Sequence, residues 1–385
     1  MDAKQRLQRL LAYLDHDPAN DRLREDAIVT ACDAEEAAVA RRLLDERLAS
    51  NPASLLKPWA FLGARVALAE RDWESALRQW LRLAEEAELP LPDRQHARAS
   101  AAHLQLRLGQ VEAATATLAP ELAQVQAGEP LPDLLQAAWL RVEHHAGRLS
   151  EGLDWALARE AQGQLAAEAA GVASMIAMDL GDLPTCDRLS RAALAQHEAQ
   201  GEALLASAAL SLFSQEPEQA LALNERVAAV RPDSGRAWTQ LGAARLLAMD
   251  LQGARVGYAR ATDLLPGHAG SWHGLAWTQL LLGDLVEAER LLDHALELDR
   301  NFAETHGALA VVYAKTGRRQ MAQESLRRAQ GLDESSFSAQ YAQALLQHPE
   351  LSGEDLITLA TRLLDSQRMP DGRRASTLLR AALRR

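Results

Sequence analysis

Apolar residues recur at helical spacing along most of the chain, with small residues between the long ones. The stretch "RAWTQLGAARLLAMDLQGARVGYARATDLLP", residues 236–266, illustrates the pattern. Trp238, Leu241 and Gly242 precede a polar break, and Ala254 and Tyr258 follow it. Spacings of three and four residues favour two amphipathic helices joined by a short turn. Because no stretch alternates apolar and polar residues as a strand does, the sequence predicts an all-α protein.

The same pattern recurs at a fixed interval, the one that separates Trp238 from Trp272, and we call this interval the repeat period. The same shift moves Leu241 onto Leu275. The turn between the two helices follows it in the series Gly147, Gly181, Gln215, Met249, Gly283 and Gly317. Six consecutive windows, residues 133–336, share the period without an insertion. A period of this length is the signature of a repeat architecture.

This unit resembles the tetratricopeptide repeat, which has about 34 residues and the pattern W-x2-L-G-x2-Y, then A-x3-F, then A, then P. The segments "WTQLG", "ARVGYARA" and "LLP" fill that pattern, and Tyr313 matches its mid-helix tyrosine later in the chain. The resemblance implies a right-handed α-solenoid, or superhelix, of stacked helix-turn-helix units. The residues support such a unit independently, because small residues such as Gly242 and Ala254 let two helices approach closely while Tyr258 fills the space beside them.

The regularity of the repeat predicts three regions. Residues 1–132 carry divergent helical repeats, preceded by a capping helix at 3–14. Residues 133–336 carry the six regular units, and residues 337–385 carry C-terminal capping helices. The steps from Arg71 to Gly109 and from Gly109 to Gly147 are both longer than the repeat period, which places extra residues in each connection, at "ELPLPDR" and "GEPLPD". Each repeat contacts only its neighbours, so one continuous array is expected.

The resemblance also implies a binding groove. In the family the first helix of each pair lines the concave surface, and its fifth, ninth and twelfth positions face the groove. The larger residues at these positions, which are the predicted partner-binding residues, are Arg141, His144, Met175, Met178, Leu205, Leu212, Thr239, Leu246, His273, Trp277, Leu280 and Val311. Small residues, Gly307 among them, hold the other positions. A lining that is mostly apolar favours an amphipathic helix or an apolar peptide as ligand.

Two interpretations of this apolar lining stay open at the level of sequence. It binds a partner, or it is covered by the next turn of the superhelix or by a second copy of the chain. Trp277 exceeds what the repeat pattern demands, so it is either a binding hot spot or a core residue. Only Arg141 among the groove positions is a cation, which argues against the carboxylate grip that some family members use on a partner's C-terminus.

Composition narrows the class of partner. The chain has 385 residues and a formal net charge of -12, so nucleic acid is not the expected partner. No apolar run approaches the roughly 20 residues of a membrane span, and no signal-peptide pattern opens the sequence. The two cysteines, Cys32 and Cys186, are too few for a disulfide framework. The sequence therefore predicts a cytoplasmic protein, and its Arg and Ala bias suggests a bacterial one.

Sequence motifs for catalysis or cofactor binding are absent. The chain contains neither a phosphate-binding G-x-x-x-x-G-K-[ST] nor a G-x-G-x-x-G, and "GHAGSWHG" resembles a nucleophile elbow only superficially. Adjacent His144 and His145 point in different directions on a helix, which suits chelation badly. Cys186 falls on the small-residue position of Ala220 and Ala254, which favours a buried role. We therefore expect no enzyme, no cofactor and no metal.

These patterns predict a scaffold or adaptor that holds a peptide or helix of a partner protein. The family resemblance implies roles such as the assembly of bacterial envelope or secretion machinery. An export chaperone or a peptide-sensing regulator is the alternative, and a non-catalytic subunit that presents substrates to an enzyme is a second one. Self-association is a further possibility. Arginines after Asp371, with no acid among them, complement a helix dipole or form a basic tip for an acidic partner.

Overall fold

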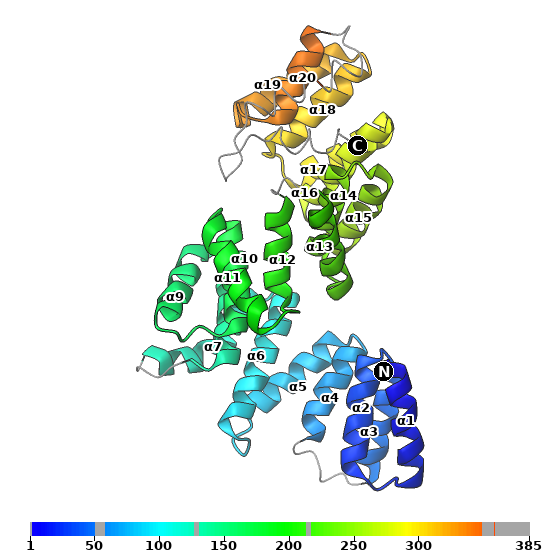
Figure 1. The fold of residues 1–385 in the computed structure, drawn as a ribbon, viewed down its shortest axis with the longest axis vertical. Helices are drawn as coiled ribbons and strands as arrows, with labels where there is room; N and C mark the ends of the chain where they lie inside the picture. Colours follow the sequence, from blue (N-terminus) through cyan, green and yellow to red (C-terminus); the bar gives the residue numbers. More distant parts are fainter. Residues whose placement is uncertain (1, 51–57, 127–130, 213–216, 349–357, 359–385) are drawn as a thin grey trace. The chain divides into compact units, whose positions relative to one another are not determined.

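The computed structural model describes residues 2–50, 58–126, 131–212, 217–348 and 358. Within these residues the protein consists of helices alone, in agreement with the predicted all-α fold (Figure 1). The chain divides into two compact units, Met1–Ala169 and Ala170–Arg385. The three sequence regions, including most of the predicted C-terminal cap and the Arg-rich end, remain predictions, because residues 359–385 lie outside the described part.

The N-terminal unit is a series of helix pairs behind one capping helix. Its helices are α1 (Ala3–His16), α2 (Asp21–Asp33), α3 (Ala37–Ser50), α4 (Trp59–Ala69), α5 (Trp73–Glu85), α6 (Leu91–Arg107), α7 (Val111–Gln126), α8 (Asp133–His145) and α9 (Leu149–Ala161). The predicted placement of the extra residues before Gly109 is wrong in one respect. Residues 91–94 form the first turn of α6 instead of a loop, because Pro92 lies at a position where a helix needs no backbone N–H.

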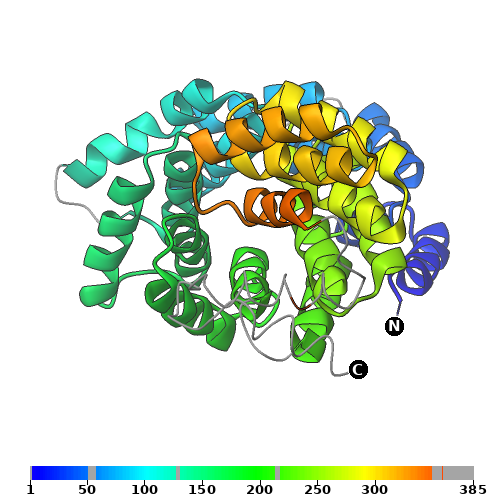
Figure 2. The same ribbon diagram turned by 90° about the horizontal axis from the view of Figure 1, so that it is seen from above.

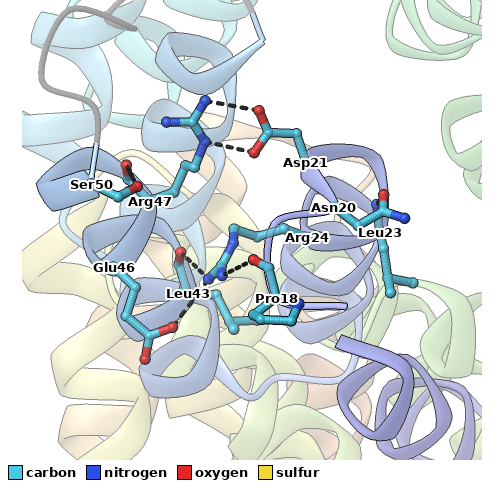
Figure 3. Close-up of polar contacts among 9 residues, drawn as sticks. All are labelled: Pro18, Asn20, Asp21, Leu23, Arg24, Leu43, Glu46, Arg47 and Ser50. Atoms are coloured by element: carbon cyan, nitrogen blue, oxygen red, sulfur yellow. Dashed lines mark hydrogen bonds and ion pairs between the residues drawn. The ribbon is translucent and has the colours of Figure 1, made fainter. Parts of the chain in front are cut away.

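Arg24 fastens the start of this unit (Figure 3). Its side chain is almost wholly buried and donates to the carbonyl oxygens of Pro18, at 3.0 Å, and Leu43, at 3.3 Å. A second arginine, Arg47, donates two bonds of 2.6 and 2.8 Å to Asp21 and holds the pKa of that carboxyl below its ordinary value. These bonds join α2 to α3 and to the loop that precedes α2, so the divergent first pair is held by polar contacts as well as by its core.

The C-terminal unit contains the regular repeats. Its helices are α10 (Ala167–Asp179), which spans the boundary between the units, α11 (Leu183–Gln196), α12 (Gly201–Leu212), α13 (Pro217–Val230), α14 (Gly235–Leu247), α15 (Leu251–Leu264), α16 (Ala269–Leu282), α17 (Leu285–Leu298), α18 (Ala303–Lys315), α19 (Arg319–Leu332) and α20 (Phe337–Gln347). From α11 onwards each helix packs against the next one, which confirms the predicted stack of helix-turn-helix units.

The described turns inside the pairs share a backbone design. The residue that the repeat period picks out takes a left-handed conformation, as Gly283 does with φ 88°. Before α15 and α17 an aspartate follows and caps the second helix: Asp250 accepts from the backbone nitrogen of Gly253 at 2.9 Å, and Asp284 accepts from that of Glu287 at 3.1 Å. Arg318 holds this place before α19 and makes no side-chain cap. Met249 occupies the left-handed position between α14 and α15 with φ 59°. The turn therefore keeps its conformation even where the sequence supplies no glycine.

The connection between pairs is closed by a repeated side-chain hydrogen bond. Trp238 Nε1 donates to the carbonyl of Pro232 at 2.9 Å, and Trp272 Nε1 donates to that of Pro266 at 2.8 Å. One repeat later the ring of His306 makes the equivalent bond to Arg300 O at 2.9 Å. The tryptophans that mark the sequence pattern thus do more than fill space, because they satisfy a carbonyl in the turn that leads into their own helix.

Candidate functional site

The predicted groove residues of the C-terminal unit lie on the first helices of the pairs, α10, α12, α14, α16 and α18. We call their shared surface the first-helix face. Met178, Leu212 and Leu246 follow one another at the repeat period and are partly exposed on successive helices of this face. They hold equivalent positions on α10, α12 and α14, and we call these three residues the apolar stripe. That these three residues bind a ligand stays a prediction.

A second set of predicted residues is polar and joins neighbouring first helices. The hydroxyl of Thr239 lies 2.8 Å from that of Ser271 on the next first helix, α16. One repeat further, His273 Nδ1 lies 3.2 Å from the hydroxyl of Thr305 on α18. Burial lowers the pKa of His273 to about 4, so its imidazole is neutral at physiological pH. Thr239 and His273 therefore link neighbouring first helices through side-chain hydrogen bonds, which we call polar rungs.

Four of the predicted groove residues are buried. Met175, Leu205 and Leu280 keep 3%, 5% and 6% of their surface exposed, and Val311 keeps none. Position in the repeat alone does not keep a side chain open, because the neighbouring helices cover these four. Val311 and Leu280 belong to the same hydrophobic cluster as Ala339 and Ala342 of α20. These residues stabilise the unit and offer almost no surface to a ligand in this structure.

Trp277 is the centre of an aromatic group on α16 and α20. Its ring centroid lies 6.4 Å from that of Phe337 and 6.5 Å from that of Tyr341. The two α20 rings stack on each other at 6.2 Å, and the ring of His273 lies 6.5 Å from that of Trp277. All four residues remain partly exposed. Sequence reasoning singled out Trp277 and missed its α20 neighbours, although Tyr341 follows the groove position of Gly307 by one repeat period.

The two remaining predicted residues lie in the N-terminal unit, on α8. Arg141 is partly buried, and its guanidinium lies 3.8 Å from the carboxylate of Glu168. The ring of His144 is 6.0 Å from that of His145, whose pKa is lowered by burial and by the neighbouring histidine and arginine. Neither Arg141 nor His144 meets an arrangement of acids that would bind a metal. Arg141 forms an ion pair with Glu168 of the next first helix, α10.

The N-terminal unit also contains a pocket that sequence reasoning missed. It has a volume of about 260 Å³ and lies between α3, α4 and α5. Leu44, Leu48, Trp59 and Leu83 supply its apolar walls, and Arg41 lies at the polar side. Glu70 already holds the Arg41 guanidinium with bonds of 2.6 and 2.9 Å. No motif marks these residues in the sequence, because the pocket depends on how far neighbouring pairs separate.

One chemical expectation, the buried role of Cys186, can be compared with the structure. Cys186 is fully buried on α11, as its small-residue position predicts, and burial raises the pKa of its thiol to about 12. The described residues contain no group of three or more histidine, cysteine, aspartate or glutamate side chains placed to hold a metal ion. None of the described helices is both long enough and apolar enough to cross a membrane.

Solved structures resemble this chain at low identity. The Cut9–Hcn1 hetero-tetramer of APC/C matches 95% of this chain and 77% of its own, with 14% identity and a TM-score of 0.45. MamA from Desulfovibrio magneticus RS-1, residues 41 to the end, matches 44% of this chain and 96% of its own, with 16% identity and a TM-score of 0.38. At these scores neither structure indicates what the chain binds. No curated protein sequence matches the chain.

Two family models match the regular repeats. Both describe the tetratricopeptide repeat, one over residues 245–310 and the other over residues 303–336. The matched residues cover α15 to α19, where the left-handed turns, the aspartate caps and the hydrogen bonds of Trp272 and His306 recur. This repeat is typically a non-catalytic module for protein–protein interaction. The chain therefore contains tetratricopeptide repeats, which the matches place at residues 245–336.

Proposed function

We propose that this protein is a non-enzymatic scaffold that holds a peptide or helix of a partner protein on the first-helix face of its C-terminal unit. The observation that supports it is the apolar stripe of Met178, Leu212 and Leu246. Three apolar side chains, one on each of three consecutive first helices, remain partly exposed, whereas Met175, Leu205, Leu280 and Val311 are buried and Thr239 is hydrogen-bonded. Apolar residues of an amphipathic ligand fit such a stripe.

The spacing of the stripe residues also sets the length of the ligand segment that can contact all three. Neighbouring helices of a packed array lie about 8–10 Å apart, so three stripe residues span about 20 Å. A helix of about fourteen residues, or an extended segment of about six, covers that distance. The proposal includes the cytoplasmic location and the role in envelope or secretion assembly that the sequence suggests. The identity of the partner will decide both.

The test replaces the stripe by charge in the full chain. A variant with Met178→Glu, Leu212→Glu and Leu246→Glu is used beside the wild type to capture proteins from a lysate of the source, and the captured proteins are identified by mass spectrometry. We expect one partner that the wild type retains and this variant loses. Burying three carboxylates against an apolar ligand costs far more than the contact provides.

A matched control carries the same three charges elsewhere. Val256, Val286 and Met321 are 55%, 82% and 44% exposed on the second helices α15, α17 and α19. A variant with all three changed to glutamate should still capture the partner. Circular dichroism and thermal melting of both variants establish that they are folded. Equal loss from both folded variants, or equal retention, would contradict the proposed site.

A further inference from the structure

The last described helix departs from the packing of the repeats. In the regular units, α14, α16 and α18 each pack more closely on the second helix of the preceding pair than on its first helix. α20 starts in register with them, since Phe337 follows Ala303 by one repeat period, yet it packs mainly along the first helix α18 and only weakly on α19. In Figure 2, α18 lies between α19 and α20. α20 therefore lies against the first-helix face instead of extending the stack.

A glycine permits this close approach. A Cβ atom built on Gly307 of α18 would lie 2.5 Å from the backbone nitrogen of Ala339 and 2.7 Å from the Cβ of Ser338. These distances are too short for any side chain at position 307. Gly307 is a predicted groove position, and here it is the place where the backbone of α20 meets α18.

One carboxylate holds the start of α20. Glu304 of α18 accepts from the backbone nitrogens of Phe337 at 2.8 Å and Ser338 at 3.1 Å, and from the hydroxyl of Ser338. Its charge also lies at the positive end of the α20 dipole. An acidic side chain of the first-helix face thus binds a helix N-terminus, which is a contact that any incoming helix could make equally well.

The side chains of α20 have the pattern of a groove ligand. Phe337, Tyr341 and Leu345 are four residues apart and lie on one side of the helix. The two aromatic rings contact Trp277 of α16, and Tyr341 and Leu345 pack against the cluster that contains Val311. α20 thus packs against Trp277 and against the cluster of Val311, two of the residues that the repeat pattern places in an open groove.

We propose that α20 is an internal occupant of the first-helix face at α16 and α18, and that the partner's binding element is an amphipathic helix with aromatic residues four apart that displaces it. This inference rests on the proposed function and specifies its ligand. The partner helix presents an aromatic residue to each side of Trp277, an apolar residue one turn later, and its N-terminus to Glu304. Removal of α20 from the site raises the affinity for such a helix, because the site is then always available.

The first experiment uses a peptide of residues 334–348, labelled with fluorescein, and measures its anisotropy with the full-length protein. One host is the wild type. The other carries Phe337→Ser and Tyr341→Ser, which weaken the hold of α20 without altering the surface beneath it. We expect the peptide to bind the double variant about tenfold more tightly than the wild type, in proportion to the fraction of open sites.

Two controls make the result specific to Trp277 and the aromatic pair. A host that carries Trp277→Ala in addition to the double substitution should lose the gain in affinity, and so should a peptide with both aromatic residues replaced by serine. If the double variant does not melt cooperatively, Tyr341→Ser alone replaces it as the host, with a smaller gain expected. The proposal is overturned if the peptide binds the wild type and the folded variant with the weakened α20 equally well. It is also overturned if the peptide does not bind that variant.

The two proposals fail separately. The peptide experiment needs no partner protein, and the substitutions of the stripe experiment lie on α10, α12 and α14, away from α20. If the peptide binds both hosts equally well while the stripe variant loses the partner, the scaffold role is kept, and α20 has no part in it. A stripe variant that still captures the partner overturns the proposed function, whatever the peptide does.

Discussion

The indole nitrogen of Trp272 donates a hydrogen bond of 2.8 Å to the carbonyl oxygen of Pro266, six residues earlier. His306 makes the same bond one repeat later. Replacement of Trp272 by phenylalanine keeps an aromatic ring and removes the donor, so we expect a loss of about 1 kcal/mol in the free energy of unfolding. Urea denaturation measures it. His306→Phe should show a loss of similar size, and no change in either variant would mean that water replaces the bond at no cost.

Tyr258 packs its ring into the space left by two glycines. A Cβ atom on Gly242 would lie 2.9 Å from ring atoms of Tyr258, and one on Gly274 would lie 2.4 Å from them. We expect Gly242→Leu to destabilise the C-terminal unit by about 1 to 3 kcal/mol, because the ring must leave its position. Thermal melting tests this, with Gly331→Leu as control, since nothing lies within 4 Å of the position of its Cβ. A melting temperature that falls equally in both variants would contradict the close contact between Gly242 and the ring of Tyr258.

Met249 holds the left-handed turn position that glycine holds at Gly283, with φ values of 59° and 88°. A side chain in that conformation is strained, so Met249→Gly should stabilise the unit by about 0.5 to 1 kcal/mol after the greater freedom of glycine in the unfolded chain is counted. The reciprocal change Gly283→Met should destabilise it. Chemical denaturation of the two variants provides the comparison, and a lower stability of Met249→Gly would show that the Met249 side chain contributes contacts that outweigh the strain.

The neutral state of His273 links stability to pH. Its pKa is about 4 in the folded protein, against about 6.5 for an unfolded histidine. Its contribution is complete above pH 6.5 and is lost as the pH falls from 6.5 to 4, because the unfolded chain then binds the proton more readily. His273→Gln retains a hydrogen-bonding side chain for Thr305 without the titration. Between pH 7.5 and pH 5 the wild type should lose about 1 to 2 kcal/mol more than this variant, measured by urea denaturation at both values.

The repeat was predictable because each repeat makes the same local contacts. Gly242 and Tyr258 meet at the helix crossing that their spacing indicates, and the periodic turn series takes left-handed conformations in the described residues. The exposure of the groove positions was not predictable in the same way. Leu246 and Leu280 occupy equivalent positions and both belong to or pack against the same hydrophobic cluster, yet Leu246 is partly exposed and Leu280 is buried.

The location of α20 depends on contacts between helices that no repeat pattern contains. Phe337 and Tyr341 follow the interval of the repeats, so the sequence assigns them to the next first helix. Their contact with Trp277, two pairs earlier, arises because Gly307 lets α20 descend onto α18. A glycine at a groove position was the available signal. In the regular units the equivalent residues are Thr239 and His273. Each forms a side-chain hydrogen bond to the next first helix, and this bond sets the separation of the two helices.

The polar rungs between first helices have a mechanical consequence. Thr239 with Ser271 and His273 with Thr305 each join one first helix to the next, so every rung crosses a single repeat boundary. A pulling force on the ends of the unit is therefore borne by these rungs in series, and each can open while its neighbours stay closed. Under tension the C-terminal unit should lengthen in steps, as the repeat boundaries open one after another. When the tension is released, the boundaries should close in the reverse order.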